Sequence, residues 1–130
     1  MISIPKKIIE KIAEHAKRDY PIEACGYLTG KDGVVSDIIK MTNTDKSNEH
    51  FSFDPNEQFQ AVKYARSRGE SLIAVYHSHP ETPARMSKED IRLANDVNMK
   101  YIIYSVKDDD IKCFSIDKDK NVSEVKIAPV

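Results

Sequence analysis

The sequence predicts an α/β protein in which a mixed β-sheet is packed with about three helices. Helical and strand periodicities alternate along its 130 residues, which is typical of an α/β architecture. Turn signals, such as Asp-Gly at 32–33, join several strands as hairpins, which favours a mixed sheet over a wholly parallel one. No glycine-rich phosphate loop follows any strand, so nucleotide binding is not expected. The length favours a single domain over residues 1–130.

The N-terminal part of the chain predicts a helix followed by a β-hairpin. Isoleucine and alanine recur at helical spacing from Pro5 to about Arg18, and Ser3 is the expected helix cap. The segment 20–30 ends this helix and begins a strand, and a second strand follows at 34–40. The Asp-Gly turn between these strands predicts that they pair as a hairpin.

The next part of the chain contains a loop, a short strand and a second helix. Residues 41–50 are polar without any period and predict a loop, whereas 51–53 alternate like a short strand. Asp54 is the expected cap of a helix over 54–69, with proline at the first helical position and Glu57 in the capping-box position. A glycine at the end of this segment is typical of a helix C-terminus.

The C-terminal half of the chain begins with the apolar run 71–79, which predicts a central strand. A third helix is expected over 87–98, with Ser87 as its cap. Acidic turns then separate three further predicted strands, at 101–106, 111–116 and 122–127.

Composition and charge exclude several classes of function. The chain has 20 lysines and arginines against 21 aspartates and glutamates, so neither nucleic acid nor a membrane surface is an expected partner. Two cysteines are too few for a disulfide framework, and their apolar surroundings are typical of buried thiols. There is no signal-peptide pattern and no stretch as long as a membrane span, so we expect a cytoplasmic protein.

His77 and His79 are candidate metal ligands at the end of the 71–79 strand. Alternate side chains of a strand share one face, with Cα atoms about 7 Å apart, so both imidazoles can bind one ion. Asp90, in the first turn of the next helix, can reach back to the same point. Two imidazoles and one carboxylate form a zinc set whose open fourth position is typical of a catalytic site. Iron or another divalent ion stays an alternative.

Glu23 is the candidate base for water activated at such a metal. This glutamate stands at the start of an apolar strand, where a lone charge is costly without a partner or a task. Spacing by itself does not bring it to the histidines. Simpler interpretations also stay open: Glu23 at an exposed strand edge, metal-free histidines, and Ser87 with Asp90 serving only as a helix cap.

These residues together resemble the motif of the JAMM/MPN+ metalloprotease family. That motif has a glutamate, later His-Ser/Thr-His-Pro, seven residues between the second histidine and a serine, and two more before an aspartate. Glu23, the HSHP at 77–80, Ser87 and Asp90 match every position. The flanking segments PIEACGYLTG and FSFDPNEQ also resemble the family. The likeness covers nearly the whole chain, which is similar to the stand-alone prokaryotic members.

The resemblance implies a cytidine-deaminase-like JAMM/MPN core with a zinc peptidase or isopeptidase activity. It implies that His77, His79 and Asp90 bind Zn²⁺. It also implies that Glu23 is the general acid/base and that Ser87 stabilises the oxyanion of the tetrahedral intermediate. The implied partner is a small ubiquitin-like or sulfur-carrier protein, whose glycine-ended tail is expected to bind as an added strand beside the 41–53 segment.

Two other functions stay open as alternatives. One is a non-catalytic MPN scaffold, although such members typically lack the metal ligands that this chain has. The other is a JAMM peptidase for cell-wall or phage-tail peptides, which the lack of a hydrolase domain or signal peptide disfavours.

Three further residues have less specific interpretations. Cys25 is expected to share a strand face with Glu23, and a buried thiol is favoured over a zinc ligand or nucleophile. His15 and His50 have no partner at metal-binding spacing, so we expect both to be solvated.

Overall fold

One eight-stranded mixed β-sheet accompanied by three helices forms the molecule, which confirms the predicted fold class. The computed structural model describes all residues from 1 to 130. None of the helices combines the length and the apolar character that crossing a bilayer requires. The elements are β1 (Ile2–Ile4), α1 (Lys6–Asp19), β2 (Cys25–Lys31), β3 (Val34–Met41), α2 (Pro55–Ser67), β4 (Ser71–His79), α3 (Lys88–Leu93), β5 (Lys100–Ser105), β6 (Asp110–Ile116), β7 (Val122–Val125) and β8 (Ile127–Pro129).

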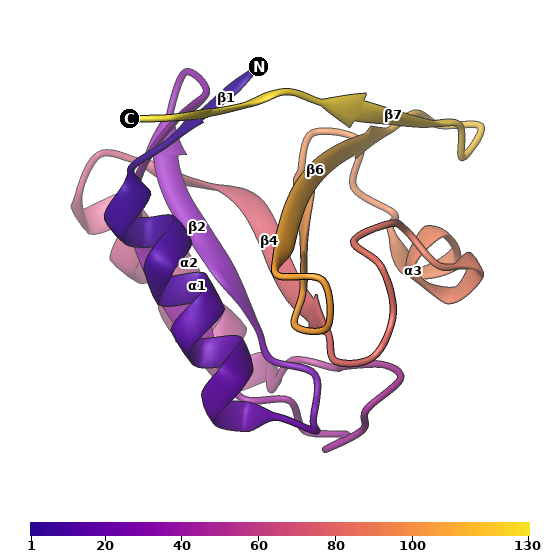
Figure 1. Ribbon diagram of the computed structural model, residues 1–130. Coiled ribbons are helices and arrows are strands. Elements are labelled where there is room, and N and C mark those ends of the chain that lie inside the picture. Colours follow the sequence, from indigo (N-terminus) through magenta and orange to yellow (C-terminus); the bar gives the residue numbers. More distant parts are fainter.

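Strand β4 lies in the middle of the sheet, whose order is β7-β6-β5-β4-β2-β3-β1-β8 (Figure 1). It pairs antiparallel with β2 and parallel with β5. The predicted hairpin of β2 and β3 is confirmed. Its turn residues Asp32 and Gly33 have φ angles of 52° and 78°, the left-handed conformation that an Asp-Gly hairpin turn requires.

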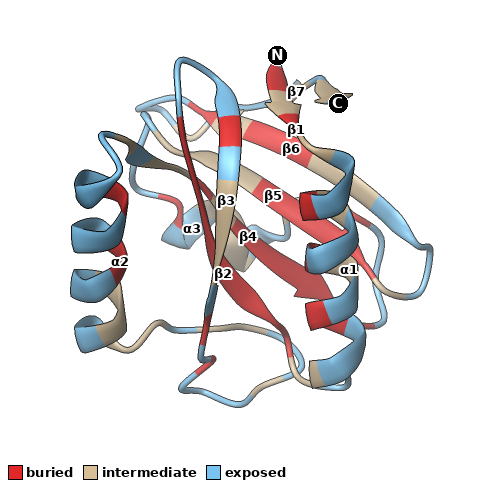
Figure 2. Cartoon of the chain, turned by 90° about the vertical axis from the view of Figure 1, so that its left-hand side faces the viewer, coloured by how far each residue is buried: buried red, intermediate tan, exposed pale blue.

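The two long helices cover opposite faces of the sheet (Figure 2). Ile8, Ile12 and Ala16 of α1 are buried one helical turn apart and join the main core cluster, which also contains Tyr76 of β4. Ala61 of α2 joins a second cluster on the other face, against which Leu72 and Val75 of β4 pack. Because strand side chains alternate, His77 and His79 lie on the α2 face and Tyr76 on the α1 face.

The start of the chain differs from the prediction. Ser3 does not cap α1, because residues 2–4 form a strand that pairs in parallel with β3 and β8. The N-cap is Pro5, and no side chain provides a capping hydrogen bond. A strand of three residues is too short to show a period, so tertiary pairing with the C-terminal strand decides this segment.

Other boundaries also differ. Residues 51–53 contribute only an isolated bridge, Asn43 with Phe53, so the short strand was wrong. Glu57 forms no capping box; its carboxylate instead accepts hydrogen bonds from the N–H and hydroxyl of Thr42. Helix α3 ends at Leu93, five residues before the predicted end at residue 98, and none of its residues is fully buried.

Candidate metal centre

Strand β4 delivers two imidazoles to one face at its C-terminal end. His77 and His79 are 3% and 4% exposed, and the ladder to β5 holds the backbone of both. Ser78 between them points to the opposite face, where its hydroxyl accepts a hydrogen bond from the Ala24 N–H at 2.8 Å. The chain then leaves the sheet at Pro80, which cannot donate to the ladder. The two histidines are therefore held rigidly at an open strand end.

Asp90 brings a carboxylate to the same point from the first turn of α3. Its Oδ1 lies 3.2 Å from His77 Nε2, and its Oδ2 lies 3.0 Å from His79 Nε2. The two Nε2 atoms are 3.2 Å apart. One ligand atom from each of the three side chains lies within 4.8 Å of the others. The structure thus brings the three predicted ligands together into a compact donor set that fits a zinc ion.

Reciprocal hydrogen bonds hold Asp90 in position at the start of its helix. The Ser87 hydroxyl accepts from the Asp90 N–H, and the Asp90 carboxylate accepts from the Ser87 N–H, both at 3.0 Å. This capping box confirms Ser87 as the helix cap and shows that the candidate ligand Asp90 is its capping-box partner. Capping therefore orients the carboxylate toward the histidines.

The protonation states of these groups suit a metal site. His79 Nδ1 lies 2.9 Å from the Pro83 carbonyl oxygen. Because a carbonyl only accepts, Nδ1 carries a proton, which leaves Nε2 as the ring nitrogen that would bind a metal ion. Burial opposes ionisation of Asp90, but hydrogen bonds from the two imidazoles outweigh it and hold the pKa of this carboxyl well below its usual value. Asp90 is therefore an anionic donor.

Glu23 is buried beside the histidine strand. It is 3% exposed, and its Oε1 has no hydrogen-bond partner. The next residue, Ala24, exchanges two hydrogen bonds with Ser78 between the histidines. Burial, and then the negative charge of Asp90, raise the pKa of the Glu23 carboxyl to about 9. Pairing of β2 with β4 begins at Cys25 and His77, two residues after Glu23. The fold therefore places an unpaired, readily protonated carboxyl group next to the donor set.

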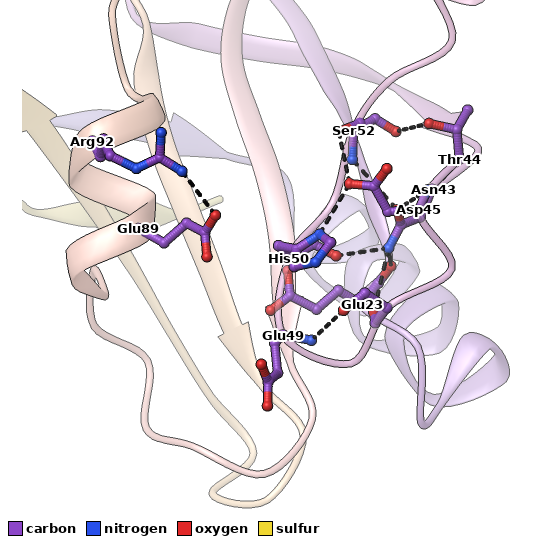
Figure 3. A network of polar contacts seen from close by, with 10 residues as sticks. Glu23, Asn43, Thr44, Asp45, Glu49, His50, Ser52, Glu89 and Arg92 are labelled. Carbon is purple, nitrogen blue, oxygen red and sulfur yellow. Dashed lines mark hydrogen bonds and ion pairs between the residues drawn. The ribbon is translucent and has the colours of Figure 1, made fainter.

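The buried side chain of Asn43 holds the main chain of Glu23 and the following loop together (Figure 3). Its Nδ2 donates to the carbonyls of Glu23 at 3.0 Å, His50 at 3.1 Å and Ser47 at 3.4 Å. The Glu23 N–H donates in turn to the Ser47 carbonyl at 2.8 Å. Sequence reasoning missed Asn43, because asparagine is common in any polar loop and no local spacing indicates these partners.

A cleft of about 430 Å³ opens beside the donor set. His77 and Asp90 lie in its wall, together with Glu89 of α3 and residues 50–53 of the loop. Most of the remaining surface is apolar and comes from Tyr27, Val75, Met86, Leu93, Met99 and Tyr101. A largely apolar cleft with a few polar groups at one end is typical of a substrate site.

Cys25 is a packed thiol, as expected. It is fully buried, and burial, followed by the nearby Glu23 carboxyl, raises the pKa of its thiol to about 12. A nucleophile would need the thiolate, which this raised pKa disfavours at neutral pH, and Cys25 is not part of the donor set.

The expectation for His15 was wrong, whereas His50 is partly solvated. His15 is 2% exposed, with Nδ1 2.7 Å from the Tyr76 hydroxyl and Nε2 3.1 Å from Asp19 Oδ2. It packs under β4 because α1 covers that face of the sheet. The His50 side chain is 42% exposed and lies 2.9 Å from Asp45 Oδ2. Neither residue joins the donor set.

Comparison with known proteins identifies several relatives of this chain. Residues 5–117 match the family described as prokaryotic homologs of the JAB domain. The chain is 33% identical over 110 residues to the CysO-cysteine peptidase of Mycobacterium tuberculosis, covering 83% of this chain and 75% of that protein. It is 29% identical over 126 residues to the probable TtuB-protein conjugate cleaving protease of Thermus thermophilus, covering 96% and 82%.

Solved structures have the same fold. A solution structure of a protein from Desulfitobacterium hafniense superposes with a TM-score of 0.91 at 43% identity, covering 100% of this chain and 93% of that one. A structure described as JAMM, a metalloprotease-like zinc site in the proteasome and signalosome, superposes with a TM-score of 0.65 at 22% identity, covering 100% and 98%. At that identity the second likeness shows the fold alone.

Proposed function

This chain belongs to the family of prokaryotic homologs of the JAB domain, the stand-alone type of JAMM/MPN protein, and on that premise we propose that it is a zinc-dependent peptidase working as one domain over residues 1–130. Its proposed substrate is the amide bond after the C-terminal glycine tail of a small ubiquitin-like or sulfur-carrier protein. The observation that carries the proposal is the convergence of two imidazoles and a carboxylate within 4.8 Å, next to a buried and unpaired glutamate.

In this proposal His77, His79 and Asp90 hold the zinc ion. A zinc ion held by these three ligands would keep one coordination position open, and it would supply Lewis acidity to water and to the scissile carbonyl. The hydrogen bond between His79 and the Pro83 carbonyl keeps that imidazole in the tautomer that a ligand needs. The capping box holds the Asp90 carboxylate in the orientation that a ligand needs.

Glu23 serves in this proposal as the general acid/base. Its unpaired oxygen can accept a proton from the attacking water and later give it to the leaving amine. Burial raises the pKa of the carboxyl to about 9, and a cation among the three ligands would lower this pKa toward neutrality. A pKa near neutral pH lets one carboxyl group perform both proton transfers.

Ser87 provides the proposed oxyanion contact. Its oxygen accepts the Asp90 N–H at 3.0 Å, which uses a lone pair and leaves the hydroxyl proton free to donate. An oxygen fixed by a helix cap is a preorganised donor for the negative charge that develops on the scissile carbonyl.

The nature of the substrate is supported by the two named relatives and by the shape of the site. One relative is named for a CysO-cysteine substrate and the other for TtuB-protein conjugates. A glycine tail has no side chains and so can lie extended along the cleft, close to the metal ligands. We propose that it binds along residues 50–53, which form one wall of the cleft, by backbone hydrogen bonds.

Cleavage of a carrier adduct by the wild-type protein and by Glu23→Gln tests the proposal. The zinc-loaded protein should release the group attached to the terminal glycine, whether cysteine or the amine of a lysine. Glu23→Gln should reduce the rate to background while the zinc content, measured by mass spectrometry, stays the same. The matched control is Glu49→Gln, which removes another nearby carboxylate and should retain activity.

Two results would contradict the proposal. An active Glu23→Gln protein would exclude the assigned proton transfer. A wild-type protein that neither binds zinc nor regains cleavage when zinc is added would favour the non-catalytic scaffold instead.

A further inference from the structure

Helix α3 carries Asp90 but has no fully buried residue. It has six residues, and Figure 1 shows it set apart from α1 and α2. A helix this short is not stable in isolation, and its last carbonyls lack partners within the helix. The capping box fixes its N-terminal end. The position of Asp90 therefore also depends on what holds the C-terminal end.

The ammonium group of Lys120 occupies that C-terminal end. Its Nζ donates to the carbonyls of Ile91 at 3.1 Å, Arg92 at 3.3 Å and Ala94 at 2.6 Å, and to Asn95 Oδ1 at 2.9 Å. A cation at this place complements the negative end of the helix dipole as well as the unpaired carbonyls. Lys120 thus gives the end of α3 the partners that the helix lacks.

The turn between β6 and β7 is ordered in a way that presents this lysine. The Lys120 N–H donates to the Asp117 carbonyl at 3.0 Å, and the Asp117 N–H donates to the Asn121 carbonyl at 3.1 Å. The Asp117 carboxylate accepts the N–H groups of Asp119 and Asn121, both at 2.9 Å. Lys120 itself has a φ of 67°, a left-handed conformation that is uncommon outside glycine. These bonds hold the lysine backbone in one conformation.

A single helical turn connects this lysine to the candidate ligand. The Ala94 N–H donates to the Asp90 carbonyl at 3.0 Å, and the Ala94 carbonyl accepts from Lys120. The segment after the helix is held separately, because the Tyr101 hydroxyl contacts the N–H and carbonyl of Asp96 at 3.1 and 2.9 Å. Lys120 is therefore the contact that acts on the helix itself.

We propose that Lys120 is a positioning residue of the metal centre. It fixes the C-terminal end of α3 and thereby holds the Asp90 carboxylate against the two histidines. The edge hairpin of the sheet, far from Asp90 in sequence, is in this way part of the support of the site. The inference rests on the proposed function only in taking His77, His79 and Asp90 as metal ligands.

Zinc affinity tests this role in Lys120→Met, which keeps an unbranched apolar stem and removes the charge. Competition with a chromogenic chelator should show zinc affinity about 10-fold or more below wild type, the usual effect of removing outer-shell support. Lys118→Met, on the same turn and exposed, is the matched control and should bind as wild type does. Lys120→Arg keeps charge and donors and should recover most of the affinity.

Cobalt absorption gives a second readout that does not depend on overall stability. Co²⁺ bound to Lys120→Met should show weakened or shifted visible bands, because the carboxylate no longer sits in one position, whereas Lys118→Met should match wild type. Wild-type zinc affinity in Lys120→Met, an equal loss in Lys118→Met, or no zinc binding by wild type would overturn the inference. A wild type that binds zinc tightly but cleaves no carrier adduct would overturn only the proposed function.

Discussion

Asn43 shows how much one buried side chain contributes at the residue scale. Its carboxamide is 7% exposed and donates to three carbonyls, one of them on Glu23. Its Oδ1 accepts from the N–H of Asp45 at 3.0 Å and of Ser52 at 3.4 Å. Removing the amide would leave carbonyl groups without partners in a place that water reaches poorly. The loop that borders the cleft and the main chain of the proposed base are thus one unit.

Asn43→Ala should weaken catalysis without weakening metal binding. We expect the free energy of unfolding to fall by about 1–3 kcal/mol, since buried acceptors lose their donor. The kcat should fall more than the KM rises, because the carboxyl of Glu23 loses its fixed position. Zinc affinity should be unchanged, because Asn43 contacts none of the three ligands. Urea denaturation, steady-state kinetics on a carrier adduct and chelator competition measure these quantities.

Thr44→Val is the matched control for this variant. It removes one hydrogen bond of the same loop, from the Thr44 hydroxyl to the Ser52 carbonyl at 3.1 Å, and leaves Glu23 untouched. Equal kinetic losses in Thr44→Val and Asn43→Ala would show that loop stability, and not the anchoring of Glu23, determines the rate.

At the scale of elements, β4 is a strand with two different faces. His77 and His79 on one face are candidate metal ligands, and Ala74 and Tyr76 on the other face belong to the core that α1 covers. Tyr76 lies against Gly26 of β2, where an added Cβ would stand 2.4 Å from the ring and from the Ile39 carbonyl oxygen, so only glycine fits there. The Tyr76 hydroxyl meets His15 of α1. Helix α1 thus supports the strand from behind the site.

The contact between α1 and β4 predicts a pH dependence of stability. Burial lowers the pKa of His15 below its ordinary value of 6.5, although Asp19 raises it. The unfolded chain therefore takes up a proton at His15 before the folded protein does. This contribution to stability is present above about pH 6.5 and is lost as the pH falls below that value.

The substitution His15→Gln should reduce the loss of folding stability at low pH. Unfolding free energies of the metal-free protein, measured in urea at pH 7.5 and 5.5, should fall more between the two pH values in wild type than in His15→Gln. The two proteins differ only at this side chain, so the difference between the two slopes isolates His15. Identical slopes would show that His15 keeps its ordinary pKa in the folded protein.

For the whole molecule, the candidate centre exists only when the chain is folded. The three ligands come from β4 and α3, and the proposed base precedes β2, so the unfolded chain holds no preformed site. Metal binding and folding are linked in such a case, and the binding free energy adds to stability.

The N- and C-terminal strands also pair with each other at the far edge of the sheet (Figure 1).

Zinc should therefore raise the melting temperature. At a free zinc concentration of about 100 times the Kd, the gain is about 2.7 kcal/mol, which corresponds to a rise of roughly 10 °C for a domain of this size. His79→Ala should lose most of this rise, whereas His50→Ala, outside the donor set, should keep it. Calorimetry with and without chelator measures the shift, and an equal rise in both variants would place the metal elsewhere.

Features that depend on residues close together in the chain could be predicted from the sequence. The strand at 71–79 has the predicted bounds, the Asp-Gly hairpin forms, and Asp54 and Ser87 cap their helices. The compact spacing of His77, His79 and Asp90 was also enough to select candidate ligands. Period, capping and spacing are local properties, so they can be predicted without knowledge of the fold.

Contacts between distant parts of the chain could be identified only in the folded structure. Pairing of β2 with β4 brings Glu23 to the histidines, and the edge hairpin brings Lys120 to α3. The burial of His15 and the partners of Asn43 follow from helix and loop packing. Their residue types are common in exposed positions, so the sequence alone does not distinguish them. The physical reason is that hydrogen bonds and burial between distant segments arise only when the whole sheet has formed.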